Sequence, residues 1–135
     1  MLSFPPGTRI FLCREPVDMR KNQDGLYAAT KEILKRDPMS GHYFVFFNRR
    51  RNRVKILFWE EGGFWVFYKR LEKGTFEVPR DLPLQGSSME VPEWRMKLIF
   101  SGISVKEFHA RTRFKGYGRN EEAYRRRSQE EVPAE

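Results

Sequence analysis

The stretch HYFVFFNRRRNRVKILFWEEGGFWVFYKR, residues 42–70, decides the fold of this chain. It holds three runs, 42–48, 53–60 and 64–70, that are rich in the aromatic and β-branched residues that strands favour. Arg49–Asn52 and Glu61–Gly63 separate the runs, and connections this short and polar are typical of turns between antiparallel strands. The sequence therefore predicts a β-meander.

Alternation along the predicted strands places apolar side chains on both faces of this sheet. In the second run Val54 and Ile56 share one face, and Leu57 lies on the other. Aromatic side chains of this kind more often supply a core or a protein interface than a stacking surface for unpaired bases, although both readings stay open. A face that the fold leaves uncovered would suit a homodimer or another protein partner.

The flanking segments add helices and further strands. We expect a first strand over Thr8–Cys13, a helix over Gln23–Lys35, a fourth strand over Thr75–Pro79, a loop over residues 80–91, a helix over Pro92–Ser101 and a third short helix opening at Ser104. The predicted fold class is α+β: a curved antiparallel β-meander of about four or five strands, with two or three helices packed on one face.

A length of 135 residues fits one domain, predicted over 1–110, followed by a charged, mobile tail over 111–135. The chain has no apolar run near the ~20 residues that a membrane-spanning helix needs, and its first residues do not resemble a signal peptide. Cys13 is the only cysteine, within an apolar run, which indicates a buried thiol in a reducing compartment. We therefore expect a cytoplasmic protein without membrane contact.

The formal net charge of +8 favours a polyanionic partner. Residues 42–73 hold eight basic and three acidic residues, so the excess is concentrated in the same stretch as the predicted meander. The candidate nucleic-acid-binding residues are Arg49, Arg50, Arg51, Arg53, Lys55, Lys69 and Arg70. Guanidinium groups at a hairpin turn can donate two hydrogen bonds to a phosphate, although a solvated charged turn would have the same sequence.

The sequence gives no pattern for catalysis or metal binding. The carboxylates read better as turn and capping residues: Asp18 as a helix cap, Asp37 in a turn, and Glu60 and Glu61 in a hairpin connection. His42 and His109 are far apart in the sequence, and with one cysteine they form no metal-ligand spacing. We therefore expect a protein that is not an enzyme and needs no cofactor or metal.

Several segments resemble the TnpB accessory proteins of the insertion sequence 66 group of bacterial transposable elements, which are unrelated to the RNA-guided nucleases of the same name. The resemblance covers about residues 9–103 and rests on Ile10–Leu12, Pro16–Lys21, Asp24–Leu26, Asp37–His42, Phe44–Leu57, Phe64–Trp65 and Tyr68–Gly74.

The resemblance implies an accessory protein that supports transposition beside a separately encoded transposase. Combined with the basic turn, it predicts a non-catalytic factor that binds DNA through the hairpin and is associated with the nucleoid. The alternative is a protein-interaction module that bridges or stabilises the transposase without contacting DNA.

Overall fold

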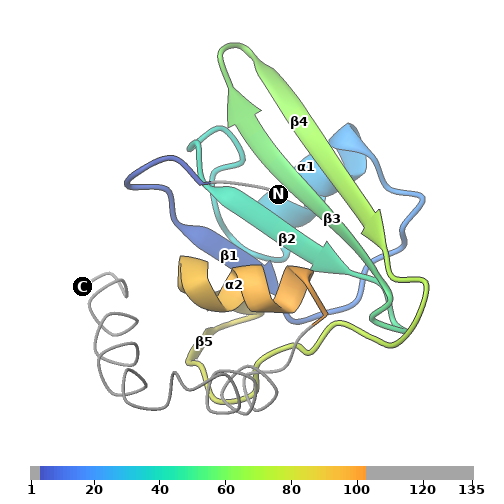
Figure 1. Ribbon diagram of the computed structural model, residues 1–135. Helices are drawn as coiled ribbons and strands as arrows, with labels where there is room; N and C mark the ends of the chain where they lie inside the picture. Colours follow the sequence, from blue (N-terminus) through green and yellow to red (C-terminus); the bar gives the residue numbers. More distant parts are fainter. Residues whose placement is uncertain (1–3, 103–135) are drawn as a thin grey trace.

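The computed structural model describes residues 4–102, which form a mixed six-stranded sheet and two helices (Figure 1). The elements in chain order are β1 (Ile10–Cys13), α1 (Gln23–Glu32), β2 (Tyr43–Phe47), β3 (Arg53–Glu60), β4 (Gly63–Arg70), β5 (Leu84–Gln85), β6 (Ser88–Glu90) and α2 (Glu93–Phe100). The α+β class predicted from the sequence is confirmed in kind, and β3 has the predicted bounds.

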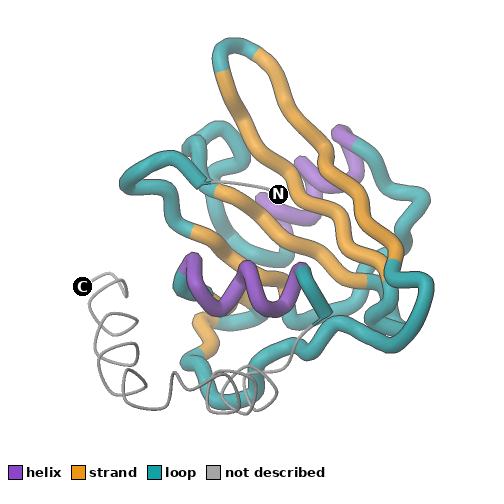
Figure 2. The backbone as a smooth tube through the Cα atoms, in the orientation of Figure 1, coloured by secondary structure: helices purple, strands orange, loops and turns teal. Residues whose placement is uncertain are grey.

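The strands lie in the order β4-β3-β2-β1-β6-β5. β2, β3 and β4 form the predicted antiparallel meander, but β1 pairs with β2 in parallel, so the prediction of a purely antiparallel sheet was wrong. A parallel pair needs a long crossover, and the segment that contains α1 supplies it. β1 therefore lies in the interior of the sheet, between β2 and β6 (Figure 2).

The two helices lie on opposite faces of the sheet, with α2 in front of it and α1 behind it in Figure 1. Met96 and Ile99 of α2 pack with Val45 and Ile56 in one core, whereas Leu26 and Ala29 of α1 belong to a second core. The prediction that the helices share one face was wrong. The physical reason is the double-sided alternation, because each apolar face of the sheet acquires its own helix.

The segment between β4 and α2 also differs from the prediction. The segment Thr75–Pro79 is not a strand. Its backbone is irregular, and the side chains of Phe76 and Val78 are buried in the core that contains α2. The predicted loop 80–91 instead holds the short strands β5 and β6, which extend the sheet beyond β1. The predicted third helix and the tail over 111–135 lie outside the described residues.

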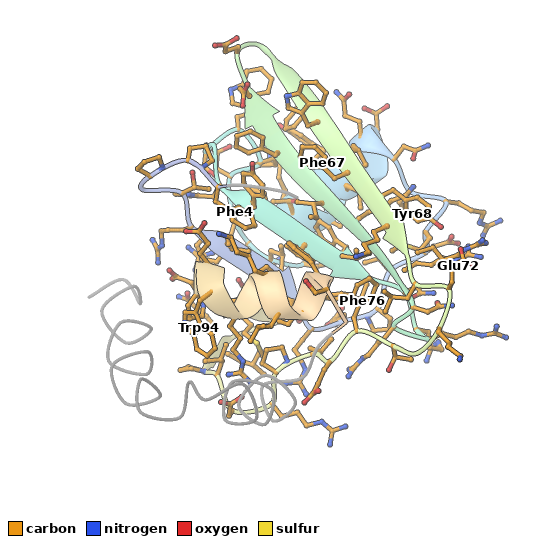
Figure 3. All side chains as sticks on the ribbon, viewed as in Figure 1. Phe4, Phe67, Tyr68, Glu72, Phe76 and Trp94 are labelled. Carbon is orange, nitrogen blue, oxygen red and sulfur yellow. The ribbon has the colours of Figure 1, made fainter. Side chains whose placement is uncertain are left out.

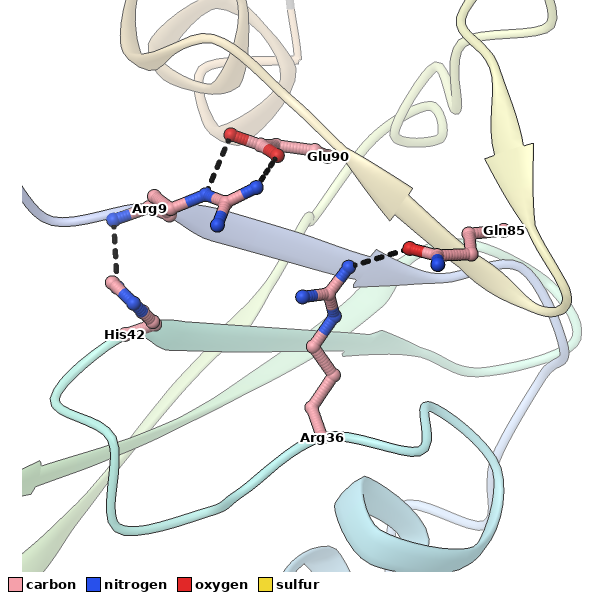
Figure 4. A network of polar contacts seen from close by, with 5 residues as sticks. All are labelled: Arg9, Arg36, His42, Gln85 and Glu90. Carbon is pink, nitrogen blue, oxygen red and sulfur yellow. Dashed lines mark hydrogen bonds and ion pairs between the residues drawn. The ribbon is translucent and has the colours of Figure 1, made fainter. Parts of the chain in front are cut away.

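A network of polar contacts lies beside β1, β2, β5 and β6 (Figure 4). The guanidinium of Arg9 pairs with the carboxylate of Glu90 through two contacts, one of which measures 3.1 Å, and the backbone N–H of Arg9 donates to Nδ1 of His42 at 3.0 Å. Arg36 donates to the side-chain oxygen of Gln85 at 2.9 Å and lies over the ring of Phe11. These contacts join the residue before β1 to β6 and to the residue before β2, and they join the segment after α1 to β5.

The predicted burial of Cys13 is confirmed, with 2% of the residue exposed. Burial raises the pKa of the Cys13 thiol to about 11. The thiol therefore stays protonated at neutral pH, and only a small fraction is present as the reactive thiolate.

Candidate nucleic-acid interface

A basic concavity with a volume of about 1020 Å³ opens on the same face of the sheet as α1. It lies between the segment 16–22, the turn 48–52 and the adjoining residues of β3 and β4. Its cationic residues are Arg20, Arg49, Arg50, Arg53 and Lys55. We call this surface the arginine concavity. Its lining also includes Asp18, Met19, Val66 and Tyr68.

The turn that carries the arginines is fixed by the side chain of Asn48. Its Oδ1 accepts hydrogen bonds from the backbone N–H of Asn52 at 3.1 Å and of Arg53 at 3.0 Å. Its Nδ2 donates to the side-chain oxygen of Asn52 at 2.7 Å. These bonds are partly buried, and they hold the backbone of residues 48–53 in one conformation. The arginines of the turn therefore project from a fixed backbone.

The segment that follows β4 supports the same turn from its other side. The backbone N–H of Leu71 donates to the carbonyl of Asn52 at 2.8 Å, and that of Phe76 donates to the carbonyl of Arg51 at 2.6 Å. Arg51 has a φ of 58°, a left-handed conformation that costs free energy for a residue other than glycine. The bond from Phe76 offsets part of that cost. The basic turn is therefore a supported part of the fold.

Lys55 forms part of the lining of the concavity as a buried side chain with 8% exposure. Its Nζ donates to the backbone carbonyl of Lys21 and to the side-chain oxygen of Asn22, at 2.8 Å each. Buried ammonium groups require such partners, because an unpaired one would be costly. Lys55 thus fixes one wall of the concavity, and its charge adds to the local positive potential.

Among residues 4–102, Asp18 is the single acidic residue in the lining of the concavity. Arg20 donates to its carboxylate through both the side chain and the backbone N–H, and these bonds lower the pKa of Asp18 to about 2. Asp18 accepts from the backbone N–H of Arg20 in the turn 18–21 that precedes α1. The N-cap residue of α1 is Asn22, so the prediction of Asp18 as a helix cap was wrong. The carboxylate is therefore ionised and paired at neutral pH.

Two arginines face each other at the mouth of the hairpin. Arg53 and Arg70 are direct cross-strand partners of β3 and β4, and so they lie on the same face of the sheet. Like charges in this arrangement repel. Arg70 pairs with Glu72 at 3.3 Å, but this pair is exposed and contributes little. An anion bound beside Arg53 and Arg70 would relieve the repulsion between their guanidinium groups.

Tyr68 supplies an aromatic wall beside these cations. It is the cross-strand partner of Lys55, its ring centroid lies 5.7 Å from Nζ of Lys55, and 51% of the residue is exposed. Figure 3 shows Tyr68 on β4, where the strand runs toward the basic turn. An exposed ring next to phosphate-binding cations can pack against a sugar or an unpaired base.

The sequence-predicted residues do not form one cluster. Arg49, Arg50, Arg53 and Lys55 line the arginine concavity, and Arg70 is a cross-strand neighbour of Arg53. Arg51 lines a different concavity together with Lys73 and Arg80. Lys69 lies on the face that carries α2 and donates to the carbonyl of Phe100 at 2.7 Å, at the end of that helix.

Sequence reasoning missed Arg20 and Tyr68. The cross-strand partnership of Tyr68 with Lys55 follows from the length of the Glu61–Gly62 turn, so Tyr68 could have been found by counting outward from it. The placement of Arg20 required the path of the chain before α1, for which no sequence pattern is available.

Asp37 and Glu61 take the predicted turn positions, whereas Glu60 is the last residue of β3 and His109 lies outside the described residues. Asp37 accepts from the backbone N–H of Met39 at 2.9 Å in a turn, and Glu61 is in the tight turn between β3 and β4. His42 directly precedes β2. Within residues 4–102, no three His, Cys, Asp or Glu residues are grouped so that they could hold a metal ion. In the same range, no helix is long and apolar enough to cross a membrane.

Comparison with known proteins identifies the family. The model of the IS66 Orf2-like proteins, TnpB_IS66, matches residues 8–110, which is most of the chain. The chain belongs to the IS66 Orf2-like family. This result confirms the resemblance seen in the sequence and indicates an accessory role in the transposition of an insertion sequence, in association with an IS66 transposase. The IS66 Orf2-like proteins are not a known catalytic family.

Two relatives of the chain from Sinorhizobium fredii (strain NBRC 101917 / NGR234) support the assignment. The uncharacterized protein y4jC is 31% identical over 97 residues, which cover 72% of this chain and 80% of y4jC. The uncharacterized protein y4hO is 30% identical over 104 residues, which cover 76% of this chain and 87% of y4hO. No solved structure gives a significant match.

Proposed function

We propose that this IS66 Orf2-like protein binds DNA in the arginine concavity and acts as a non-catalytic accessory factor in transposition. One observation carries the proposal: among the described residues, five cationic side chains from two separate segments line one concavity, and four of them remain uncompensated after Arg20 pairs with the carboxylate of Asp18. Hydrogen bonds to Asn48 and from Phe76 hold the backbone of the turn that carries these arginines.

The chemistry of the concavity suits phosphate. Arg49, Arg50 and Arg53 can each donate to a phosphate oxygen in a bidentate manner, and Lys55 adds a fixed positive charge below them. Tyr68 can pack against the adjacent sugar or base. Such contacts fix the position of the protein on the DNA backbone and confer little sequence preference. The protein would therefore hold the DNA of the element for a separately encoded transposase, which supplies the chemistry.

The test is fluorescence anisotropy with labelled duplex DNA across a salt series. One duplex carries a terminal inverted repeat of the host element, and the other is an unrelated sequence of equal length. Phosphate binding predicts an affinity that falls steeply with salt, with a slope that grows by about 0.9 for each phosphate contacted. Equal affinities would leave sequence choice to the transposase. Tighter binding to the repeat would identify a factor that recognises the ends of the element.

A pair of charge-matched variants tests the location of the site. Arg49→Ala, Arg50→Ala and Arg53→Ala together remove three charges from the arginine concavity. Arg51→Ala, Lys73→Ala and Arg80→Ala together remove three charges from the other concavity. We expect the first variant to lower the salt slope by roughly 2 to 3, and the second to bind nearly as well as wild type. Equal losses in both would mean that only the net charge matters.

The competing function is a module that bridges the transposase without touching DNA. Absence of binding to either duplex at low salt would exclude DNA contact by the isolated protein and favour this alternative. The transposase would then be tested directly as the partner, with the same two triple variants.

A further inference from the structure

Within residues 4–102, β4 is an outer strand of the sheet, and no strand of that range pairs with its outer edge, so this edge can pair with another strand. On the side of β4 that faces β3, the odd-numbered Leu71 donates from its backbone N–H to the carbonyl of Asn52, the residue before β3. Because backbone groups point to alternate sides along a strand, the N–H and C=O groups of Phe64, Val66, Tyr68 and Arg70 face outward. Five of the eight residues of β4 are exposed, and Trp65 is 54% exposed.

We propose that a second copy of this chain pairs with the free edge of β4, so that two antiparallel β4 strands form one continuous sheet across a two-fold axis at Val66. The even-numbered residues carry the free backbone groups, so only a register that pairs even with even residues forms hydrogen bonds. With the axis at Val66, Phe64 lies opposite Tyr68 of the second copy, and Trp65 lies opposite Phe67 of the second copy. Such aromatic cross-strand pairs stabilise sheets.

A cavity beside β4 supports this register. It has a volume of about 330 Å³ and lies between the strand and α2, with an apolar lining that includes Ile56, Phe67 and Phe100. Trp65 and Phe67 lie on this face of the sheet, because their cross-strand partners Phe58 and Ile56 belong to the core that contains α2. In the proposed dimer, Trp65 of each copy lies opposite Phe67 of the other, next to this cavity. Aromatic side chains that fill apolar cavities of a partner often contribute much of the binding energy of an interface, and Trp65 would take this position.

The charges at the two ends of β4 are complementary in the same arrangement. Glu60 and Glu61 lie at the turn before β4, and Lys69 and Arg70 lie at its end. The two-fold axis at Val66 places Arg70 of one copy opposite Gly62 of the other, beside Glu61 of that copy. Antiparallel pairing therefore brings acidic and basic ends together twice, whereas parallel pairing would put like charges side by side.

The dimer does not depend on DNA binding. A two-fold axis perpendicular to the sheet keeps the same face of both sheets on one side. The two arginine concavities would therefore open on one surface of the dimer. A test based on mass and covalent linkage in the absence of DNA leaves the proposed function to its own experiment.

The first test is the mass in solution together with a site-specific disulfide. Light scattering of the purified full chain should give twice the monomer mass of 16.2 kDa. In the variant Val66→Cys, the two introduced thiols face each other across the axis, with a Cα–Cα distance of about 5.5 Å, and should form a disulfide under mild oxidation. The matched control Tyr68→Cys should not, because its two copies lie four residues apart along the strands, about 13 Å. Wild type, whose Cys13 is buried, should not link either.

A monomer at every concentration would overturn the proposal, as would a dimer in which Val66→Cys fails to link or links no faster than Tyr68→Cys. Efficient and selective linkage through residue 66 would support both the interface and its register.

Two further variants separate loss of the interface from loss of the fold. Val66→Pro removes an outward N–H that β3 does not use, so the variant should fold but be monomeric; Val66→Thr is the matched control and should remain dimeric. Trp65→Ala should weaken dimerisation about 30-fold or more. Circular dichroism identifies any variant that has unfolded, and the disulfide test then decides. A Val66→Pro variant that folds and remains dimeric would contradict the proposal.

Discussion

The ammonium of Lys55 on β3 lies 2.8 Å from the backbone carbonyl oxygen of Lys21, which precedes α1. This partly buried hydrogen bond connects the sheet to the segment that carries Arg20. One cationic side chain therefore serves both as a structural link and as part of the wall of the arginine concavity. Removing it should affect both stability and binding.

Lys55→Met should lower the free energy of unfolding by about 1–3 kcal/mol, because two partly buried acceptors lose their donor. Urea denaturation measures the loss. Lys21→Met is the matched control, since Lys55 contacts only the backbone carbonyl of that residue, and it should be near neutral. An equal effect of the two substitutions would show that the loss arises from charge alone.

Arg53→Gln should raise stability while it weakens DNA binding. The substitution removes the repulsion between Arg53 and its cross-strand partner Arg70, which is worth about 0.2–1 kcal/mol at low salt. Thermal unfolding in low and high salt measures the effect, and screening should shrink the gain at high salt. Arg50→Gln removes an exposed charge from the turn and should not stabilise to the same extent. A destabilised Arg53→Gln variant would mean that the guanidinium has a structural role.

Asn48→Ala should destabilise the protein by about 1–3 kcal/mol, because the backbone N–H groups of Asn52 and Arg53 lose their acceptor. It should also weaken DNA binding, since the arginines of the turn would no longer be held in one arrangement. Denaturation and anisotropy measure the two effects. Asn52→Ala removes only the bond between the two side chains and should cost less. Unchanged DNA affinity in Asn48→Ala would mean that order in the turn is unimportant for binding.

The central meander could be predicted from the sequence because its information is local. Alternation and two short turns set β2, β3 and β4, and the bounds of β3 were predicted to the residue. The position of β1 could not be predicted in this way, because its parallel pairing with β2 depends on the crossover through α1. β5 and β6 were missed because strands of two and three residues carry no measurable periodicity.

The candidate site was predictable in part for the same reason. The arginines lie in one local turn, so their proximity followed directly from the sequence. Their division between two concavities could not be foreseen, because the left-handed backbone of Arg51 has no signal in the sequence; Arg51 lines one concavity, and Arg50 and Arg53 line the other. The structural use of Lys55 and Lys69 depends on contacts with residues 21 and 100, far away in the sequence.

His42 should make stability fall as the pH is lowered below its ordinary pKa of 6.5. Burial lowers the pKa of His42 in the folded state, and the charge of Arg9 adds to the effect. The unfolded chain therefore binds more protons than the folded chain just below pH 6.5, so acidification favours unfolding. Stability is fully present above the unfolded pKa and is lost as the pH falls toward the folded one.

Urea denaturation between pH 5 and pH 7.5 measures this dependence. The paired carboxylates Asp18 and Asp81 lose their contributions only at lower pH, because their pKa values lie below 3.8, so this window excludes the effect of these two groups. In His42→Asn, the side-chain oxygen can still accept from the backbone N–H of Arg9, but it does not titrate. The variant should show a flatter pH dependence than wild type, and an identical slope would assign the dependence to other groups.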